Sequence, residues 1–136
     1  MNKKIIFLQI KKFNLDLLKK KSFEKNLINL QKIFKMNFYQ YECDAFEEHK
    51  GLDPWVQWVN INTGKKYNEH NLREIGESSN LKFNQIWDVL SDNNIKTGVW
   101  GTMNAKNNNK KNNLVFLPDP WNDEQICNPK YLKNIF

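Results

Sequence analysis

Cysteine and histidine, which form disulfides and metal sites, are scarce in this chain. It has two cysteines, Cys43 and Cys127, which lie far apart and show no Cys-x-x-Cys spacing. This argues against a zinc finger and a disulfide framework, and it favours two reduced thiols. The chain also has only two histidines, whereas a two-metal catalytic site usually draws on about three histidines and several carboxylates.

Long hydrophobic runs are also absent. The stretch MNKKIIFLQIKKF at the start has a basic beginning, but its apolar run of about five residues is shorter than a signal peptide requires. No segment approaches the roughly 20 apolar residues of a membrane-crossing helix. We therefore expect no membrane span and a cytoplasmic location.

Arginine is nearly missing from a basic chain. The net charge is +6, yet 20 of the 21 basic residues are lysine and only Arg73 is arginine. Recognition of bases and phosphates usually relies on the arginine fork. The 22 asparagines, together with the lysines and isoleucines, are typical of an AT-rich genome. We interpret the charge as compositional drift and expect no specific nucleic-acid partner, with an anionic partner as the alternative.

The length of 136 residues predicts a single domain over residues 1–136, large enough to bury a core. The hydrophobic patterns predict strands at 4–10, 37–43, 96–100 and 114–117. They predict helices at 22–35, 55–62 and 83–90, and a short helix or turn at 14–21. Residues 65–80 are expected to be irregular, and the Lys/Asn tract at 104–113 to be solvated and mobile.

The order of these elements predicts an α/β fold with a mainly parallel sheet and helices on both of its faces. In such sheets the ligand site lies beyond the carboxyl ends of the strands. Those ends carry residues 9–14, 43–54, 101–104 and 118–121. Asn104, at one of these ends, is therefore a candidate for a substrate pocket.

Three stretches resemble the alkaline phosphatase-like superfamily of phosphatases, phosphodiesterases and sulfatases. They are DPWVQWVNINTGKKYNEHNL at 53–72, QIWDVLSDNNIKTGVWGTMNA at 85–105 and FLPDPW at 116–121. The opening KIIFLQIKKFN is similar to the first strand of that superfamily. The best match is to uncharacterised bacterial members with the pattern Glu-Pro-Trp-x-Gln-Trp, then Thr-Gly, then Glu-His-Gly.

The resemblance implies an incomplete three-layer fold and a function class. Members hydrolyse or transfer phosphate or sulfate esters with a divalent metal pair, usually zinc, that activates the nucleophile. Their later Asp, Asp-His-Gly and His ligands would lie beyond Phe136. The chain would be the N-terminal portion of such an enzyme, inactive alone, with a second chain as the partner that completes the fold.

Two residues are candidates for the metal site that the resemblance implies. Gln9 stands where the first strand should deliver an acid, and an amide binds a divalent metal only weakly. Its alternative role is a polar residue at a strand end. Asp53 is the reactive side chain nearest the nucleophile position, because counting back from Thr63 lands on Pro54. Asp53 is either a phosphoryl acceptor and metal ligand or the N-cap of the following helix.

Other residues of the matched stretches have paired interpretations as well. Thr63 carries a hydroxyl, although the motif places it at a helix end, where a structural role is the alternative. Gln57 and Trp58 are candidates for the substrate pocket, with core packing as the alternative for the tryptophan. His70 is expected to form structural hydrogen bonds rather than bind metal. Asn71 replaces the family glycine and tolerates positive φ.

A different function class is open to the same residues. The chain could be a non-catalytic binding or assembly module that retains part of the fold, because Gln9 replaces an acid and an ordinary hydroxyl nucleophile is missing. A nucleic-acid binder built on the KNNNKK tract is a third hypothesis.

Overall fold

The computed structural model describes the chain as two compact units, Met1–Cys43 (unit 1) and Asp44–Phe136 (unit 2). The described residues are 4–10, 14–36, 46–47, 50–124 and 126–135. Within these ranges no helix is long and apolar enough to cross a membrane.

Unit 1 contains two short helices, α1 (Leu15–Glu24) and α2 (Ile28–Phe34). Asn14 caps α1, since its Oδ1 accepts a hydrogen bond of 2.8 Å from the N–H of Leu17. The prediction of one helix over 22–35 is wrong, because Asn26 at φ 49° interrupts it. Ser22 lies inside α1, and its hydroxyl donates to the Lys19 carbonyl at 2.7 Å.

The predicted strand at 4–10 is also wrong, because this segment has no regular secondary structure. Ile5 and Ile6 are 91% and 84% exposed, so their side chains are not packed. A strand is formed by pairing, and among the described residues no partner strand is bonded to this segment. The predicted strand at 37–43 lies outside the described residues.

Unit 2 begins with a short antiparallel hairpin, β1 (Phe46–Glu47) and β2 (Lys50–Gly51), followed by α3 (Pro54–Thr63). The predicted helix at 55–62 is confirmed, with Pro54 in its first turn. Gly64 ends the helix at φ 67°, and its N–H donates to the Asn60 carbonyl at 2.8 Å. Val59 on α3 packs with Leu72 and Leu81 into a buried cluster.

The next segment is more regular than predicted. It forms α4 (Tyr67–His70) and the 3-10 helix η1 (Ser78–Asn80). Asn71 ends α4 at φ 57°, so the expectation that Asn71 tolerates positive φ is confirmed.

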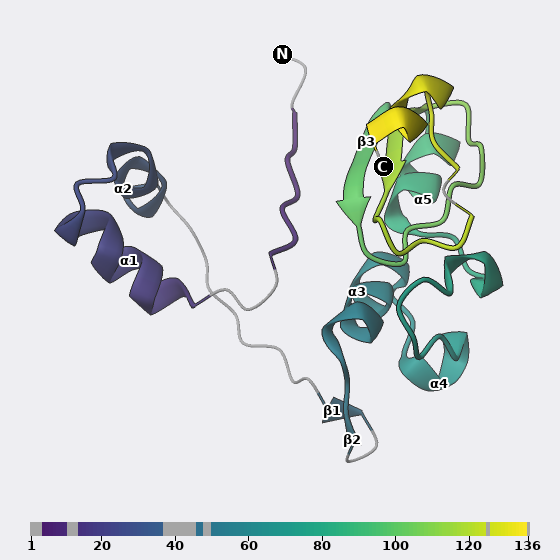
Figure 1. The fold of residues 1–136 in the computed structure, drawn as a ribbon, viewed down its shortest axis with the longest axis horizontal. Helices are drawn as coiled ribbons and strands as arrows, with labels where there is room; N and C mark the ends of the chain where they lie inside the picture. Colours follow the sequence, from purple (N-terminus) through teal and green to yellow (C-terminus); the bar gives the residue numbers. More distant parts are fainter. Residues whose placement is uncertain (1–3, 11–13, 37–45, 48–49, 125, 136) are drawn as a thin grey trace. The chain divides into compact units, whose positions relative to one another are not determined.

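The largest assembly of unit 2 is a strand pair covered by a helix, α5 (Ile86–Asp92), seen beside the strands in Figure 1. The strands β3 (Thr97–Thr102) and β4 (Asn113–Pro118) run parallel, and Val99 lies opposite Phe116. The Phe116 ring meets Trp87 of α5 edge to face, with the ring centres 6.1 Å apart. The predictions of helix 83–90 and of strands 96–100 and 114–117 are confirmed with shifted ends, and the molecule is of mixed α/β type.

The end of the chain packs on β4. Phe116 and Asn128 exchange two backbone hydrogen bonds, of 2.7 and 2.9 Å, and η2 (Lys130–Ile135) follows. Leu117, Leu132 and the buried side chain of Cys127 form a small cluster there. Cys43 lies outside the described residues.

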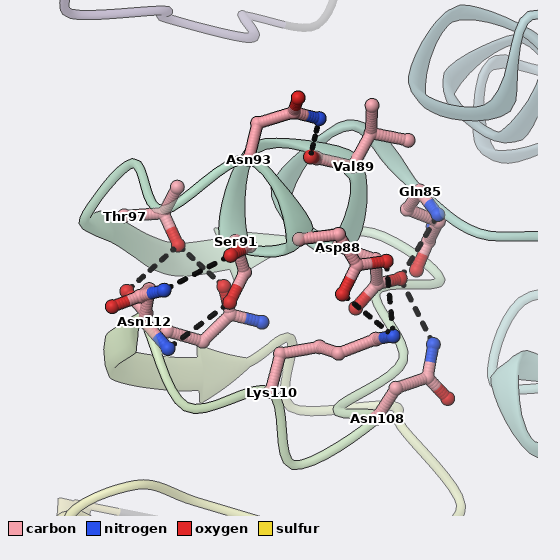
Figure 2. Close-up of polar contacts among 11 residues, drawn as sticks. Gln85, Asp88, Val89, Ser91, Asn93, Thr97, Asn108, Lys110 and Asn112 are labelled. Atoms are coloured by element: carbon pink, nitrogen blue, oxygen red, sulfur yellow. Dashed lines mark hydrogen bonds and ion pairs between the residues drawn. The ribbon is translucent and has the colours of Figure 1, made fainter.

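The Lys/Asn tract departs most from its prediction. Asn104, Asn107 and Asn113 are 0%, 8% and 1% exposed, so the expectation of a solvated tract is wrong for these residues. A buried amide is stable only when its polar atoms are bonded to protein. The Asn104 amide is bonded at both of its ends, to Gly76 and Glu74. Asn108 and Asn112 of the tract bond Asp88 and Ser91 of α5, as Figure 2 shows.

Candidate functional site

The carboxyl ends of β3 and β4 are joined by a buried carboxylate. Asp119 follows β4 directly and is 1% exposed. Its Oδ2 accepts a hydrogen bond of 3.0 Å from the N–H of Asn104, which follows β3, and its Oδ1 accepts one of 3.0 Å from the N–H of Trp121. The loops after the two strands therefore meet at Asp119, at the edge where ligand sites of parallel sheets lie.

Asn104 forms a hydrogen-bonded junction at this edge. It is fully buried at φ 51°. Its Oδ1 accepts from the Gly76 N–H at 2.8 Å, and its Nδ2 donates to the Glu74 carbonyl at 3.0 Å. Its own carbonyl accepts from Gln85 Nε2 at 3.0 Å. The predicted pocket residue thus directs both ends of its amide to the loop before η1.

Gly76 lets that loop approach the segment after β4. Its φ of 91° is in a region that L side chains rarely adopt. A Cβ added there would collide with the backbone carbonyl oxygen of Trp121. Glycine is therefore needed here twice, for its conformation and for its lack of a side chain.

Burial changes the acidity of the Asp119 carboxyl group. Desolvation raises its pKa above the ordinary value of 3.8, and the negative charge of Asp123 adds to the rise. The hydrogen bonds from the N–H groups of Trp121 and Asn104 act in the opposite direction but do not cancel it. The carboxyl group at the strand ends therefore holds its proton more tightly than an exposed aspartate does.

Asp123 forms a second polar cluster with the start of η1. Burial alone would raise its pKa, but hydrogen bonds from the hydroxyls of Ser79 and Ser78 leave the pKa lowered. Asn122 is buried beside them, and its Nδ2 donates to the Ser78 hydroxyl at 2.7 Å and to the Ala105 carbonyl at 2.8 Å. This cluster fixes the Ser78–Asn80 turn against the segment after β4.

The candidate residues of α3 are placed at its two ends. Asp53 is exposed before the helix, and its side chain makes no capping hydrogen bond, so only its backbone serves the helix start. Thr63 donates its hydroxyl to the Val59 carbonyl at 2.7 Å and accepts from the Lys65 N–H at 3.1 Å. The Thr63 hydroxyl thus takes part in the end of the helix, as its alternative role predicts.

Gln57 and Trp58, the candidates for a substrate pocket, lie between these ends. Both are half-buried, and Gln57 Nε2 donates to the Leu52 carbonyl at 2.6 Å. Trp55, one turn before Trp58, donates its ring N–H to the Arg73 carbonyl at 2.9 Å. Two of these three side chains therefore bond the segments that flank α3.

His70 is buried in a structural position. Its Nδ1 accepts from the Leu72 N–H at 3.0 Å, and its Nε2 lies 2.7 Å from Asn60 Oδ1. The first bond assigns the ring proton to Nε2, which donates to Asn60. The prediction that His70 forms structural hydrogen bonds is confirmed.

Among the described residues, the side chains do not assemble the donor set of a zinc pair. Gln9 lies in the segment 4–10 of unit 1, and Asp53 lies directly before α3 in unit 2. In the part of the chain that the structure describes, no three His, Cys, Asp or Glu side chains form a group that could hold a metal ion. Zinc sites usually have at least three such protein ligands, so the described residues do not fit the metal that the resemblance implies.

Beside the edge formed by the carboxyl ends of β3 and β4 lies a groove that the sequence analysis did not predict. It encloses about 660 Å³. Its lining is polar and basic and comes from two segments, with Ser79, Asn80, Leu81, Lys82, Phe83 and Asn84 on one side and Lys106, Asn108 and Lys110 on the other. These residues are separated in sequence, and the only signal for them is the density of lysine and asparagine.

The wall formed by the tract is fixed to α5 (Figure 2). Asp88 Oδ2 accepts from Asn108 Nδ2 at 2.9 Å, and Asn112 Nδ2 donates to the Ser91 carbonyl at 2.9 Å. Lys110 forms an ion pair of 2.9 Å with Asp92. The groove therefore has a wall held by hydrogen bonds rather than a freely solvated loop.

Comparisons with known proteins found no matching family model, no matching curated protein and no matching solved structure.

Proposed function

We propose that this chain is the N-terminal portion of a metal-dependent hydrolase or transferase of phosphate or sulfate esters, of the alkaline phosphatase-like superfamily, and that it is inactive alone. The observation that carries the proposal is the contact between Asn104 and Asp119, which brings two of the matched stretches together at the carboxyl ends of parallel strands. Ligand sites of α/β proteins lie at this edge.

The surface of the strand pair supports a larger, three-layer fold. Parallel sheets are normally covered on both faces, whereas Trp100 of β3 is 64% exposed and Leu114 of β4 is 47% exposed. In this proposal further strands and helices, supplied by a second chain, cover these side chains. The metal ligands that the described residues lack would come with them.

The candidate side chains of this chain are better suited to binding a ligand than to catalysing ester turnover. The Thr63 hydroxyl is bonded at both its donor and acceptor sides within the helix end. Asp53 is exposed and is the remaining candidate for a metal ligand or phosphoryl acceptor. Its partners in the reaction are absent from the described donor groups, so we expect no turnover by the isolated chain.

Two experiments test the proposal. The DNA that follows the Phe136 codon is read in all three frames, and an open frame encoding Asp-His-Gly and further histidines is expected. The chain is then assayed with zinc or manganese on nitrophenyl phosphate, the corresponding diester and nitrophenyl sulfate, with and without the product of that frame. Activity that needs both chains and falls in Asp53→Asn supports the proposal. Turnover by this chain alone would contradict the proposal that the isolated chain is inactive.

A non-catalytic binding or assembly module is the second candidate. It is favoured by the hydrogen bonds that bind the amides of Asn104 and Gln57 to protein carbonyls. A stoichiometric partner in a pull-down, with no ester turnover in the presence of that partner, would support the module. A clean monomer that recruits no partner would exclude an assembly role.

A further inference from the structure

The basic groove lies outside every stretch that carries the family resemblance. Its lining comes from residues 79–84 and 106–110, which fall between the matched stretches 53–72, 85–105 and 116–121. The groove is therefore a feature of this chain that the proposed function does not explain.

The groove carries positive charge that the described residues neutralise only in part. Three lysines line it and no carboxylate does. Lys110 is paired with Asp92, but the Lys106 ammonium is bonded only to carbonyl oxygens. Lys82 is exposed and forms no hydrogen bond or ion pair within the described residues. Two ammonium groups are thus left for an anion.

The Lys106 ammonium is held in place before any ligand arrives. Its Nζ donates to the carbonyls of Ser79 and Leu81 at 2.9 and 2.8 Å. Its backbone N–H donates to Oε1 of the fully buried Gln85 at 2.7 Å. An ammonium group has three donors, so one remains for a ligand. Because its position is fixed, binding costs little side-chain entropy.

The groove also offers an apolar surface. Phe83 lines it and packs against the buried cluster of Val59, Leu72 and Leu81. The Lys65 Nζ lies 5.4 Å from the centre of the Phe83 ring, but it is paired with Glu69 at 3.0 Å and so adds no net charge there. The volume of about 660 Å³ falls within the range of about 300–1,000 Å³ that is usual for small-molecule sites.

We propose that this groove binds a small organic oxyanion. The anionic group lies between Lys82 and Lys106, and a planar apolar part of the ligand rests on Phe83. This is a binding site and no bond of the ligand breaks in it. It depends neither on the proposed hydrolase nor on a second chain.

The test is an NMR titration of the full chain at constant ionic strength. The probes are phenyl phosphate, phenyl sulfate and benzoate, with inorganic phosphate for the contribution of the anion alone. We expect saturable shifts of the amides at 79–84 and 106–110. Phenyl phosphate should bind most tightly because it is a dianion with a ring, and several-fold more tightly than inorganic phosphate.

Matched variants decide whether the groove lysines are responsible. Lys82→Gln is expected to weaken phenyl phosphate about ten-fold, as the loss of one charge-assisted contact does. Lys111→Gln removes the same charge from an exposed position next to Lys110 that does not line the groove, and should leave binding unchanged. Lys106→Gln should weaken binding as well, but its two carbonyl contacts make Lys82→Gln the safer variant.

Three results would overturn the proposal. The first is shifts that do not saturate or that spread over lysines throughout the chain. The second is an equal effect of Lys82→Gln and Lys111→Gln. The third is a short oligonucleotide that binds more tightly than every probe and perturbs amides beyond the groove, which would identify a nucleic-acid surface instead.

Discussion

At the residue scale, asparagine has a structural role in turns and helix ends that its abundance in the sequence does not reveal. Among the described residues, five asparagines have positive φ, between 49° and 60°, namely Asn26, Asn71, Asn94, Asn104 and Asn109. Asparagine is among the few residues besides glycine that adopt this conformation readily. The chain has only five glycines, so asparagine ends helices and forms turns in their place. An AT-rich genome therefore does not by itself account for these asparagines.

The first prediction separates the two roles of Asn104. Asn104→Gly keeps the backbone conformation but removes the bonds to Glu74 and Gly76, and it should lower the free energy of unfolding by about 2 kcal/mol. Asn104→Ala should cost about 0.5–1 kcal/mol more, because alanine is strained at positive φ. Urea unfolding measures both changes.

Asn109→Ala is the control for the strain alone, because Asn109 also has positive φ but is exposed. If Asn104→Gly were as stable as the wild type, the side-chain hydrogen bonds of Asn104 would not contribute to stability at the strand ends.

The second prediction concerns the pH dependence that Asp119 causes. Its pKa is raised in the folded state, so the folded chain binds this proton more tightly than the unfolded chain. The stability that this group contributes is present at low pH and is lost as pH rises through the folded pKa. Unfolding of the wild type and of Asp119→Asn is compared from about pH 7 to about pH 4. The wild type should gain stability relative to the variant as pH falls.

Asp119→Asn should also be the less stable protein throughout, because its Nδ2 would face an N–H donor. A stability difference that does not change with pH would mean that the Asp119 carboxyl group has an ordinary pKa.

At the element scale, local signals were sufficient for some elements and not for others. Helix α3 was predictable because Pro54 and Gly64 mark its start and end within the chain itself. The strands β3 and β4 were predictable because each contains a short apolar run with polar residues next to it. The segment at 4–10 has an equally apolar pattern, yet a strand depends on a partner that no local pattern supplies.

The third prediction tests the packing of the strand pair on α5. Phe116 is fully buried against Trp87, so Phe116→Ala should lower the free energy of unfolding by about 3–5 kcal/mol. Its neighbour Val115 is 37% exposed, and Val115→Ala should cost less than about 1 kcal/mol. Urea unfolding measures the free energy of unfolding of both variants. If the two variants lose similar amounts of stability, the contact between Phe116 and Trp87 is not the centre of the core.

At the scale of the whole molecule, the buried apolar side chains described by the structure all belong to unit 2. In the described part of unit 1, Ser22 is the only buried residue. Helices as short as α1 and α2 are marginal in water without tertiary packing. The stability of the chain should therefore come from unit 2.

The fourth prediction is that residues 44–136 fold without residues 1–43. The shorter chain should give dispersed NMR signals and a melting temperature within a few degrees of the full chain, because its three apolar clusters are retained. Residues 1–43 alone serve as the comparison and should show no cooperative transition. An unfolded 44–136 chain would show that unit 1 supplies stability that its described residues do not explain.

The candidate site could be predicted from the sequence only in part. The rule for parallel sheets pointed to residues 101–104 and 118–121, and Asn104 and Asp119 do meet there. The basic groove could not be predicted, because Lys82 and Lys106 are brought to one surface by contacts among η1, α5 and the tract. Those contacts are mostly amide and carbonyl hydrogen bonds, which leave no periodic pattern in a sequence.

The burial of Asn104, Asn107 and Asn113 in the Lys/Asn tract has a consequence for how its gene can change. Codons for lysine and asparagine differ only at their third base, so a single nucleotide substitution exchanges the two residues. At Lys111, which is exposed, such an exchange alters only surface charge. At Asn104 and Asn113, which are 0% and 1% exposed, it would force an ammonium group into a space shaped for an amide. A tract that looks repetitive in the DNA therefore contains codons that can vary freely and codons that cannot.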